Sequence, residues 1–153
     1  IDVRLNTLDV RGRGVNGVYL TVLGTSADGA DSGQVGRGNC PNGVIPLNRH
    51  MGSEAAAGKN PVSHVGKIYN LLTHRMANAI YERVPGLEEV HVWLVSQIGE
   101  PIDQPAIAAA QVIPEEGTRI EEVRGQIVEV MDSELGNIDR FCEELAEGKI
   151  PIC

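Results

Sequence analysis

The sequence has little of what marks membrane, nucleic-acid-binding or disulfide-stabilised proteins. Its 153 residues contain one tryptophan, one phenylalanine and three cysteines. No apolar run approaches the roughly 20 residues that a membrane span needs. The 13 basic residues are outnumbered by 21 acidic ones, so the formal net charge of -8 offers no basic surface for a nucleic-acid backbone. We therefore predict that neither a membrane nor a nucleic acid is a partner.

The cysteines and histidines show no spacing that would hold a metal ion. Cys40, Cys142 and Cys153 form no CxxC pair, and no two histidines lie one helical turn apart. These residues therefore predict no metal site, thiols that stay reduced, and a cytoplasmic location. The chain begins at Ile1 within a strand-like pattern, which we interpret as a piece of a longer protein.

Alternation of apolar and polar residues, together with β-branched runs, predicts four strands, at residues 1–8, 18–23, 89–98 and 106–113. The glycines of residues 11–17 predict a turn between the first two strands, which pair most simply as antiparallel neighbours. In the third strand, Val90, Val92 and Leu94 are expected on one face. Trp93 falls on the other face, where we expect a helix or a subunit boundary.

The first predicted helix follows the second strand and a long loop. Asn60 is the expected cap, Pro61 the first helical residue, and Pro85-Gly86 the end. One face of this helix should carry Lys67 and other polar residues. The opposite, apolar face should carry Val65, Ile68, Leu72, Met76 and Ile80.

The C-terminal region is predicted to be helical and acidic. Thr118 and Glu121 have the spacing of a capping box, and Gly136 is expected to divide two helices. We interpret the acidic residues as a solvated helix face that lies opposite an apolar stripe. The order ββαββα predicts an α+β fold for residues 1–153, with a mostly antiparallel sheet and helices on one face.

Residues 24–61 form a glycine-rich stretch that we predict to be an active-site loop. Among its glycines lie Asp28, Asp31 and Arg37, so carboxylates and a guanidinium could reach a ligand that backbone amides also approach closely. Glycine-rich loops with these residues also occur as simple turns. The pattern leaves both interpretations open.

The end of this loop predicts a phosphate site. Gly58 and Lys59 come directly before the expected helix start at Asn60, where free N–H groups and a lysine charge would both attract an anion. His64 lies about one turn further on. The spacing is not that of a Walker motif. The alternative is an exposed lysine beside an ordinary cap.

Four segments carry a resemblance to a known family: GTSADGADSGQVGRGN at residues 24–39, NGVIP at 42–46, EAAAGKNPVSHVGKIYN at 54–70 and SQIGEPIDQP at 96–105. Together they resemble the archaeal-type branch of the methionine adenosyltransferases, or S-adenosylmethionine synthetases. The resemblance covers nearly all of this chain and corresponds to the C-terminal portion of the family's full length.

The resemblance implies roles for individual residues. Asp31 matches the family's methionine-binding aspartate. Arg37 and Lys59 match the catalytic basic residues that hold the triphosphate. Ile98-Gly99 matches the segment that lines the adenine pocket. Gly58, Asn60 and His64 fall within the ATP-binding set by their position around Lys59.

Some positions depart from the better-known bacterial and eukaryotic pattern. That pattern has a lysine and an aspartate where this chain has Ser63 and Val65, and His64 or Lys67 are the candidates to replace them. Cys40 stands where archaeal-type relatives usually have arginine. These departures bear on how phosphate and magnesium are bound.

The reaction implied by the resemblance is the attack of the methionine sulfur on C5′ of ATP, after which the leaving triphosphate is cleaved to diphosphate and phosphate. Mg²⁺ is the implied cofactor, with K⁺ as a further candidate. Such a displacement needs stabilisation of a departing polyanion more than it needs acid–base groups. The predicted site fits this need because it offers positive charge and no nucleophile.

The family is built from related α+β domains around a pseudo-threefold axis, with active sites between two subunits. The resemblance therefore implies a homodimer, in which an exposed sheet face would be an interface. The family's N-terminal His-Pro-Asp motif has no match in this chain, so the isolated chain is expected to be inactive. The alternative function is a non-catalytic nucleotide-binding or assembly module.

Overall fold

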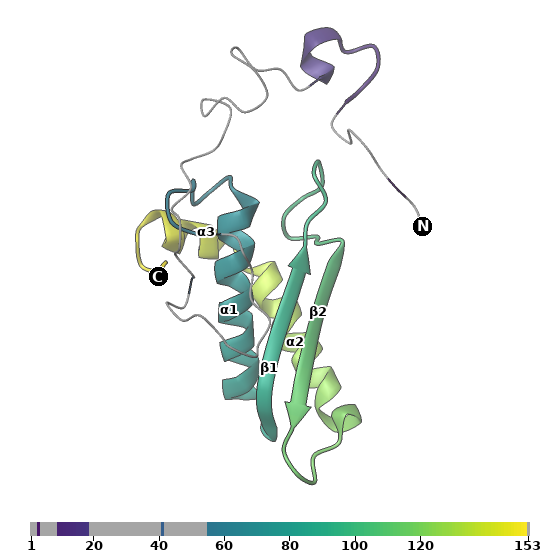
Figure 1. Ribbon diagram of the computed structural model, residues 1–153, viewed down its shortest axis with the longest axis vertical. Coiled ribbons are helices and arrows are strands. Elements are labelled where there is room, and N and C mark those ends of the chain that lie inside the picture. Colours follow the sequence, from purple (N-terminus) through teal and green to yellow (C-terminus); the bar gives the residue numbers. More distant parts are fainter. Residues whose placement is uncertain (1–2, 4–8, 19–40, 42–54, 153) are drawn as a thin grey trace.

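The structure is a computed structural model that describes residues 3, 9–18, 41 and 55–152. Within these residues the elements are a short 3-10 helix and an α+β unit of three α-helices and two strands (Figure 1). In chain order they are η1 (Gly14–Gly17), α1 (Val65–Arg83), β1 (Leu87–Val95), β2 (Ile107–Pro114), α2 (Ile120–Gly136) and α3 (Ile138–Ala146). The α+β class is confirmed. Nearly all of the strands predicted at residues 1–8 and 18–23 lies outside the described residues.

The turn predicted at residues 11–17 is confirmed. It contains η1, and it is closed by a backbone hydrogen bond of 2.7 Å in which the Val10 N–H donates to the Gly17 carbonyl oxygen.

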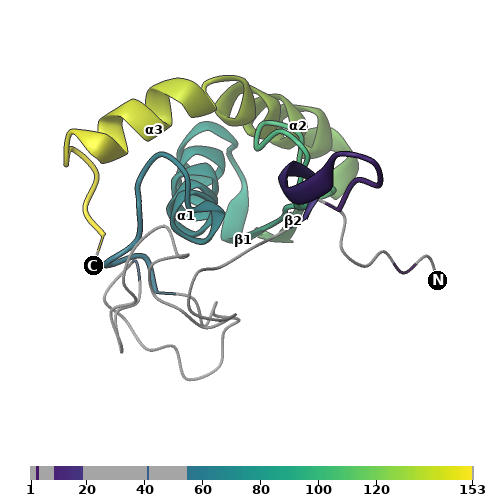
Figure 2. The same ribbon diagram turned by 90° about the horizontal axis from the view of Figure 1, so that it is seen from above.

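The strands β1 and β2 form an antiparallel pair in which His91 lies opposite Gln111 and Trp93 opposite Ala109. Val90, Val92 and Leu94 of β1 pack against the helical core, as their alternation predicts. Seen from above, α2 and α3 form an arch over α1 and the strand pair (Figure 2). The helices therefore cover one face of the sheet.

The core is built on α1. Its residues Ile68, Leu72, Met76 and Ile80 are almost completely buried, which confirms the predicted stripe at helical spacing. The first half of α1 packs against α3, and the second half packs against β1 and α2. The two ends of α1 are therefore held by different parts of the chain.

The break after α1 occurs where Pro85-Gly86 predicts it, since α1 ends at Arg83. Gly86 has a φ of 82°, and a Cβ atom at this position would lie 2.4 Å from the Thr118 hydroxyl oxygen. Both the backbone conformation and the close approach of Thr118 require glycine here. This contact closes the end of the unit where α1 turns into β1.

The helix starts differ from the prediction. The first helix begins at Val65 rather than Pro61, because Asn60 forms a separate turn: its side-chain oxygen accepts from the Val62 N–H at 2.9 Å, and its carbonyl accepts from the His64 N–H at 3.2 Å. The cap of α1 is His64.

The predicted capping box at the start of α2 is also wrong. Arg119 is the N-cap of α2 and makes no side-chain capping bond, and Thr118 packs against Gly86 instead. The division of the C-terminal region at Gly136 is confirmed, because α2 ends there and α3 follows. Of the apolar stripe predicted on α2, Ile120 is exposed in the first turn, and the others are buried: Val123, Ile127, Met131 and Leu135.

One arginine joins the three α-helices. The Arg75 guanidinium on α1 forms ion pairs with Glu134 of α2 at 2.8 Å and Glu144 of α3 at 2.7 Å, and it lies 5.4 Å from the ring centre of Phe141. The hydrogen bond from Arg75 holds the pKa of the Glu144 carboxyl below its usual value. Glu134 is buried, so the acidic region is not solvated throughout.

Candidate functional site

Two of the predicted site segments lie at one end of the unit. The chain enters α1 at the end where it later leaves β1, so residues 55–64 and the loop between β1 and β2 both lie beside the first turns of α1 (Figure 1). Asp31 and Arg37, with the rest of residues 24–40 and 42–54, lie outside the described residues. The described part of the site is therefore the Lys59 turn and the Ile98-Gly99 loop.

Lys59 is buried, with 4% of its surface exposed. Its ammonium group donates a hydrogen bond to the carbonyl oxygen of Ala55, four residues earlier, at 2.5 Å. Gly58, with a φ of 75°, allows the tight turn between them. The alternative of an exposed lysine beside an ordinary cap is therefore wrong.

Lys67 is the second buried lysine at this end of the unit. We expected it on the polar face of α1, but only 8% of its surface is exposed. Its ammonium group donates to the carbonyl oxygen of Lys59 at 3.0 Å, eight residues back along the chain. The reason is that the turn at residues 60–64 folds the Lys59 backbone against the start of α1.

His64 caps α1 with its ring. The Nδ1 atom accepts a hydrogen bond from the Gly66 N–H at 3.1 Å, so in this state Nδ1 carries no proton and Nε2 is the protonated ring nitrogen. The ring is partly exposed. His64 can therefore offer an Nε2–H to an anion while it keeps the helix capped.

The β1–β2 loop carries Ile98 and Gly99 on the outside of the molecule. Ile98 is 66% exposed, and Gly99 has a φ of 92°, which favours glycine. The loop is held by Tyr69 of α1, whose hydroxyl donates to the Ile102 carbonyl oxygen at 2.6 Å. Burial, and to a smaller extent the Asp103 carboxylate, raise the pKa of Tyr69, so this hydroxyl keeps its proton at neutral pH.

The sequence analysis missed Tyr69. A signal was present, because Tyr69 follows Val65 by four residues and precedes Leu72 by three, which is the spacing of a buried helix face. Lys67 and Tyr69 are two residues apart and therefore about 200° apart around the helix. The Lys59 turn and the β1–β2 loop accordingly flank the start of α1 on opposite sides.

Neither a metal cluster nor a membrane-spanning helix occurs in the described part of the chain. No group of three or more His, Cys, Asp or Glu residues there could hold a metal ion. None of the described helices is long and apolar enough to cross a membrane.

Comparison with known proteins identifies the family. The family model for S-adenosylmethionine synthetase (AdoMet synthetase) matches residues 1–149. The S-adenosylmethionine synthases of Thermococcus onnurineus and Pyrococcus horikoshii are 49% and 51% identical over 152 residues, which is 99% of this chain and 37% of each relative. That of Methanosarcina barkeri is 50% identical over 133 residues, which is 87% of this chain and 33% of the relative.

The chain thus spans about a third of the length of these archaeal relatives, over which the identity is about half. The match extends across the buried Lys59 turn, the cap of α1 and the β1–β2 loop. The resemblance found in the sequence is confirmed, and the chain belongs to the S-adenosylmethionine synthetase family.

Proposed function

We propose that this chain is part of an enzyme that forms S-adenosylmethionine from ATP and L-methionine and releases diphosphate and phosphate. The observation that carries the proposal is the family match over residues 1–149, together with relatives named S-adenosylmethionine synthase at about 50% identity. A non-catalytic nucleotide-binding or assembly module is the alternative. The cytoplasmic location stays a prediction.

In this proposal the Lys59 turn receives the triphosphate. Lys59 supplies a full positive charge, Gly58 and Asn60 shape the turn, and the His64 Nε2–H is a further donor. Arg37 adds a guanidinium from the loop. These groups stabilise the charge that develops as the triphosphate leaves, which is the chemical demand of the displacement.

Adenine is proposed to bind at Ile98 and Gly99. The support is their exposure at the same end of the unit as the Lys59 turn, and an apolar side chain suits the face of a base. Methionine is proposed to bind through Asp31, whose carboxylate can pair with the substrate ammonium group.

The Mg²⁺ implied by the family, and K⁺ with it, stay predictions. The described residues contain no cluster of metal ligands, so they do not fit a metal site by themselves. The proposed role of the Lys59 turn therefore rests on its own basic groups.

The function is tested by assaying the full-length protein with ATP, methionine and magnesium. We expect equal amounts of S-adenosylmethionine, diphosphate and phosphate. In the same assay, Asp31→Asn should raise the KM for methionine by about tenfold or more and change the KM for ATP much less, because a charge-assisted bond contributes roughly 1.5–3 kcal/mol.

Asp132→Asn, which makes the same change on the exposed side of α2, is the matched control and should behave like the wild type. Absence of S-adenosylmethionine would favour the non-catalytic alternative. An Asp31→Asn variant that lost affinity for ATP alone would mean that Asp31 binds the metal or the ribose and not methionine.

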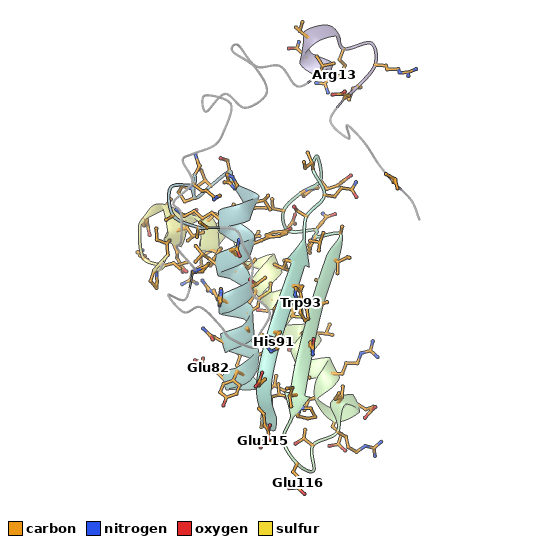
Figure 3. All side chains as sticks on the ribbon, in the orientation of Figure 1. Arg13, Glu82, His91, Trp93, Glu115 and Glu116 are labelled. Carbon is orange, nitrogen blue, oxygen red and sulfur yellow. The ribbon has the colours of Figure 1, made fainter. Side chains whose placement is uncertain are left out.

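A homodimer is proposed to form through the outer face of the sheet. This face carries four apolar residues that the helices leave exposed. Their exposed fractions range from 38% for Trp93 to 54% for Ile107, and those of Ile113 and Val95 are intermediate. His91 and Trp93 project from β1 on this face (Figure 3). Their rings are stacked, with 6.4 Å between the ring centres. Val95 lies opposite Ile107 and next to Trp93 on this face, and exposed apolar residues grouped in this way are typical of an interface.

We expect Val95→Lys to weaken the dimer of the full-length protein by at least about tenfold, because the change places a charge in an apolar contact. Val128→Lys is the matched control, since Val128 is equally exposed but lies on α2. Sedimentation equilibrium measures both. An unchanged dimer dissociation constant for Val95→Lys would mean that the interface lies on another surface.

A further inference from the structure

The two buried lysines beside the start of α1 are linked by a chain of two hydrogen bonds. Lys67 binds the carbonyl oxygen of Lys59, and the side chain of Lys59 binds the carbonyl oxygen of Ala55. Burying an ammonium group is costly unless it is well bonded, so a second lysine in such a place calls for an explanation. In the bond that Lys67 makes to Lys59, a charged donor meets a backbone acceptor, which is a strong type of hydrogen bond.

The backbone of the turn is fixed at both ends. Ala56 is completely buried in the core cluster that contains Leu72 and Phe141, and the Lys59 carbonyl is held by Lys67. Between them lies Gly58, which is exposed. The backbone that carries Lys59 is therefore anchored independently of where the Lys59 ammonium group points.

The contact between Lys59 and Ala55 has the same chemistry as the contact between Lys67 and Lys59, because each joins an ammonium group to a neutral backbone carbonyl oxygen. What distinguishes Lys59 is the phosphate role proposed for it. A phosphate oxygen carries negative charge and is a stronger acceptor for the same group. The Lys59 side chain can thus exchange one acceptor for the other, provided that its backbone stays in place.

We propose that Lys67 is a positioning residue for Lys59: it holds the Lys59 backbone while the Lys59 ammonium group passes from the Ala55 carbonyl to a phosphate oxygen of the nucleotide. This inference rests on the phosphate role proposed for Lys59. Lys67 acts through the Lys59 carbonyl and not by touching the phosphate. Its effect is therefore lost once the Lys59 side chain is absent.

A double-mutant cycle in the full-length enzyme tests this dependence. Lys67→Met removes the charge and keeps much of the aliphatic chain. We expect it to lower kcat by about tenfold with a smaller change in the KM for ATP, because misplacement of a charge weakens the transition state more than the ground state. In the Lys59→Ala background, the same change should lower kcat by less than about twofold.

Lys149→Met is the matched control and should leave kcat unchanged, since Lys149 is an exposed lysine after α3. Circular dichroism and a thermal melt check that each variant is folded. If Lys67→Met does not fold, the cycle is measured with Lys67→Gln, which keeps a neutral hydrogen-bond donor and should show the same loss of effect in the Lys59→Ala background.

The failures of the two proposals are distinguishable. Losses from Lys67 and Lys59 that multiply would overturn the positioning role, because they would mean that Lys67 acts by itself, either on the phosphate or on stability. An unchanged kcat in Lys67→Met would overturn it too. An unchanged kcat in Lys59→Ala would instead remove the phosphate role of Lys59.

Discussion

Lys59→Ala in the full-length enzyme is expected to lower kcat by about a hundredfold or more. One fixed charge or donor aimed at a developing anion typically contributes this much, because it needs no reorganisation at the moment of reaction. The backbone of Lys59 meets the condition of being fixed, since the residue is buried and its carbonyl oxygen is tied to α1. The KM for methionine should change far less, because methionine is proposed to bind at Asp31.

The measurement is steady-state turnover at saturating ATP, methionine and magnesium. Lys149→Ala removes a lysine of the same chain from an exposed position and is the control. A thermal melt is needed beside the assay, because Lys59→Ala also removes the hydrogen bond to Ala55. A folded Lys59→Ala enzyme with wild-type kcat is the outcome that contradicts a phosphate role.

The second large effect is expected from the isolated chain of 153 residues, which should form no S-adenosylmethionine. It spans 37% of the Thermococcus and Pyrococcus relatives, and its described residues hold no metal-ligand cluster. The His-Pro-Asp motif, to which the resemblance assigns a catalytic histidine and a magnesium-binding aspartate, has no match here. In the proposed reaction, the divalent ions that the resemblance implies would neutralise the triphosphate, and two or three basic side chains cannot replace them.

This expectation is checked by incubating the purified chain with ATP, methionine and magnesium and measuring S-adenosylmethionine by mass spectrometry. The Lys59→Ala variant of the same chain sets the background, and the full-length enzyme is the positive control. Product above the Lys59→Ala background would mean that the catalytic groups have been assigned to the wrong part of the protein.

The elements that were predictable from the sequence are those set by local periodicity. Residues such as Leu72 and Ile80 fix the apolar face of α1, and the alternation around Val92 fixes the face of β1. The helix starts were not predictable in the same way. Thr118 is a good cap by residue type, but its contact with Gly86, which is distant in sequence, takes precedence. Asn60 likewise forms its own turn.

For the candidate site, the sequence names residues but does not give their geometry. The sequence identifies Lys59, His64 and Ile98 as candidates, and it places Lys59 directly before a helix. It does not show that Lys59 and Lys67 are buried, because that depends on how the turn between them folds back onto α1. It also does not show that Tyr69 reaches the Ile102 carbonyl across the fold.

Because a ribosome releases the chain from its N-terminus, the contacts around Arg75 form only after the later helices have been synthesised. The core around Ala56, beside the Lys59 turn, is completed by Phe141 and Leu145, and Arg75 meets Glu144 across 69 positions of sequence. These partners all belong to α3, which follows α1 in the chain. The Lys59 turn of a nascent chain therefore lacks part of its packing until α3 has emerged, about 80 residues after Lys59 itself has been added.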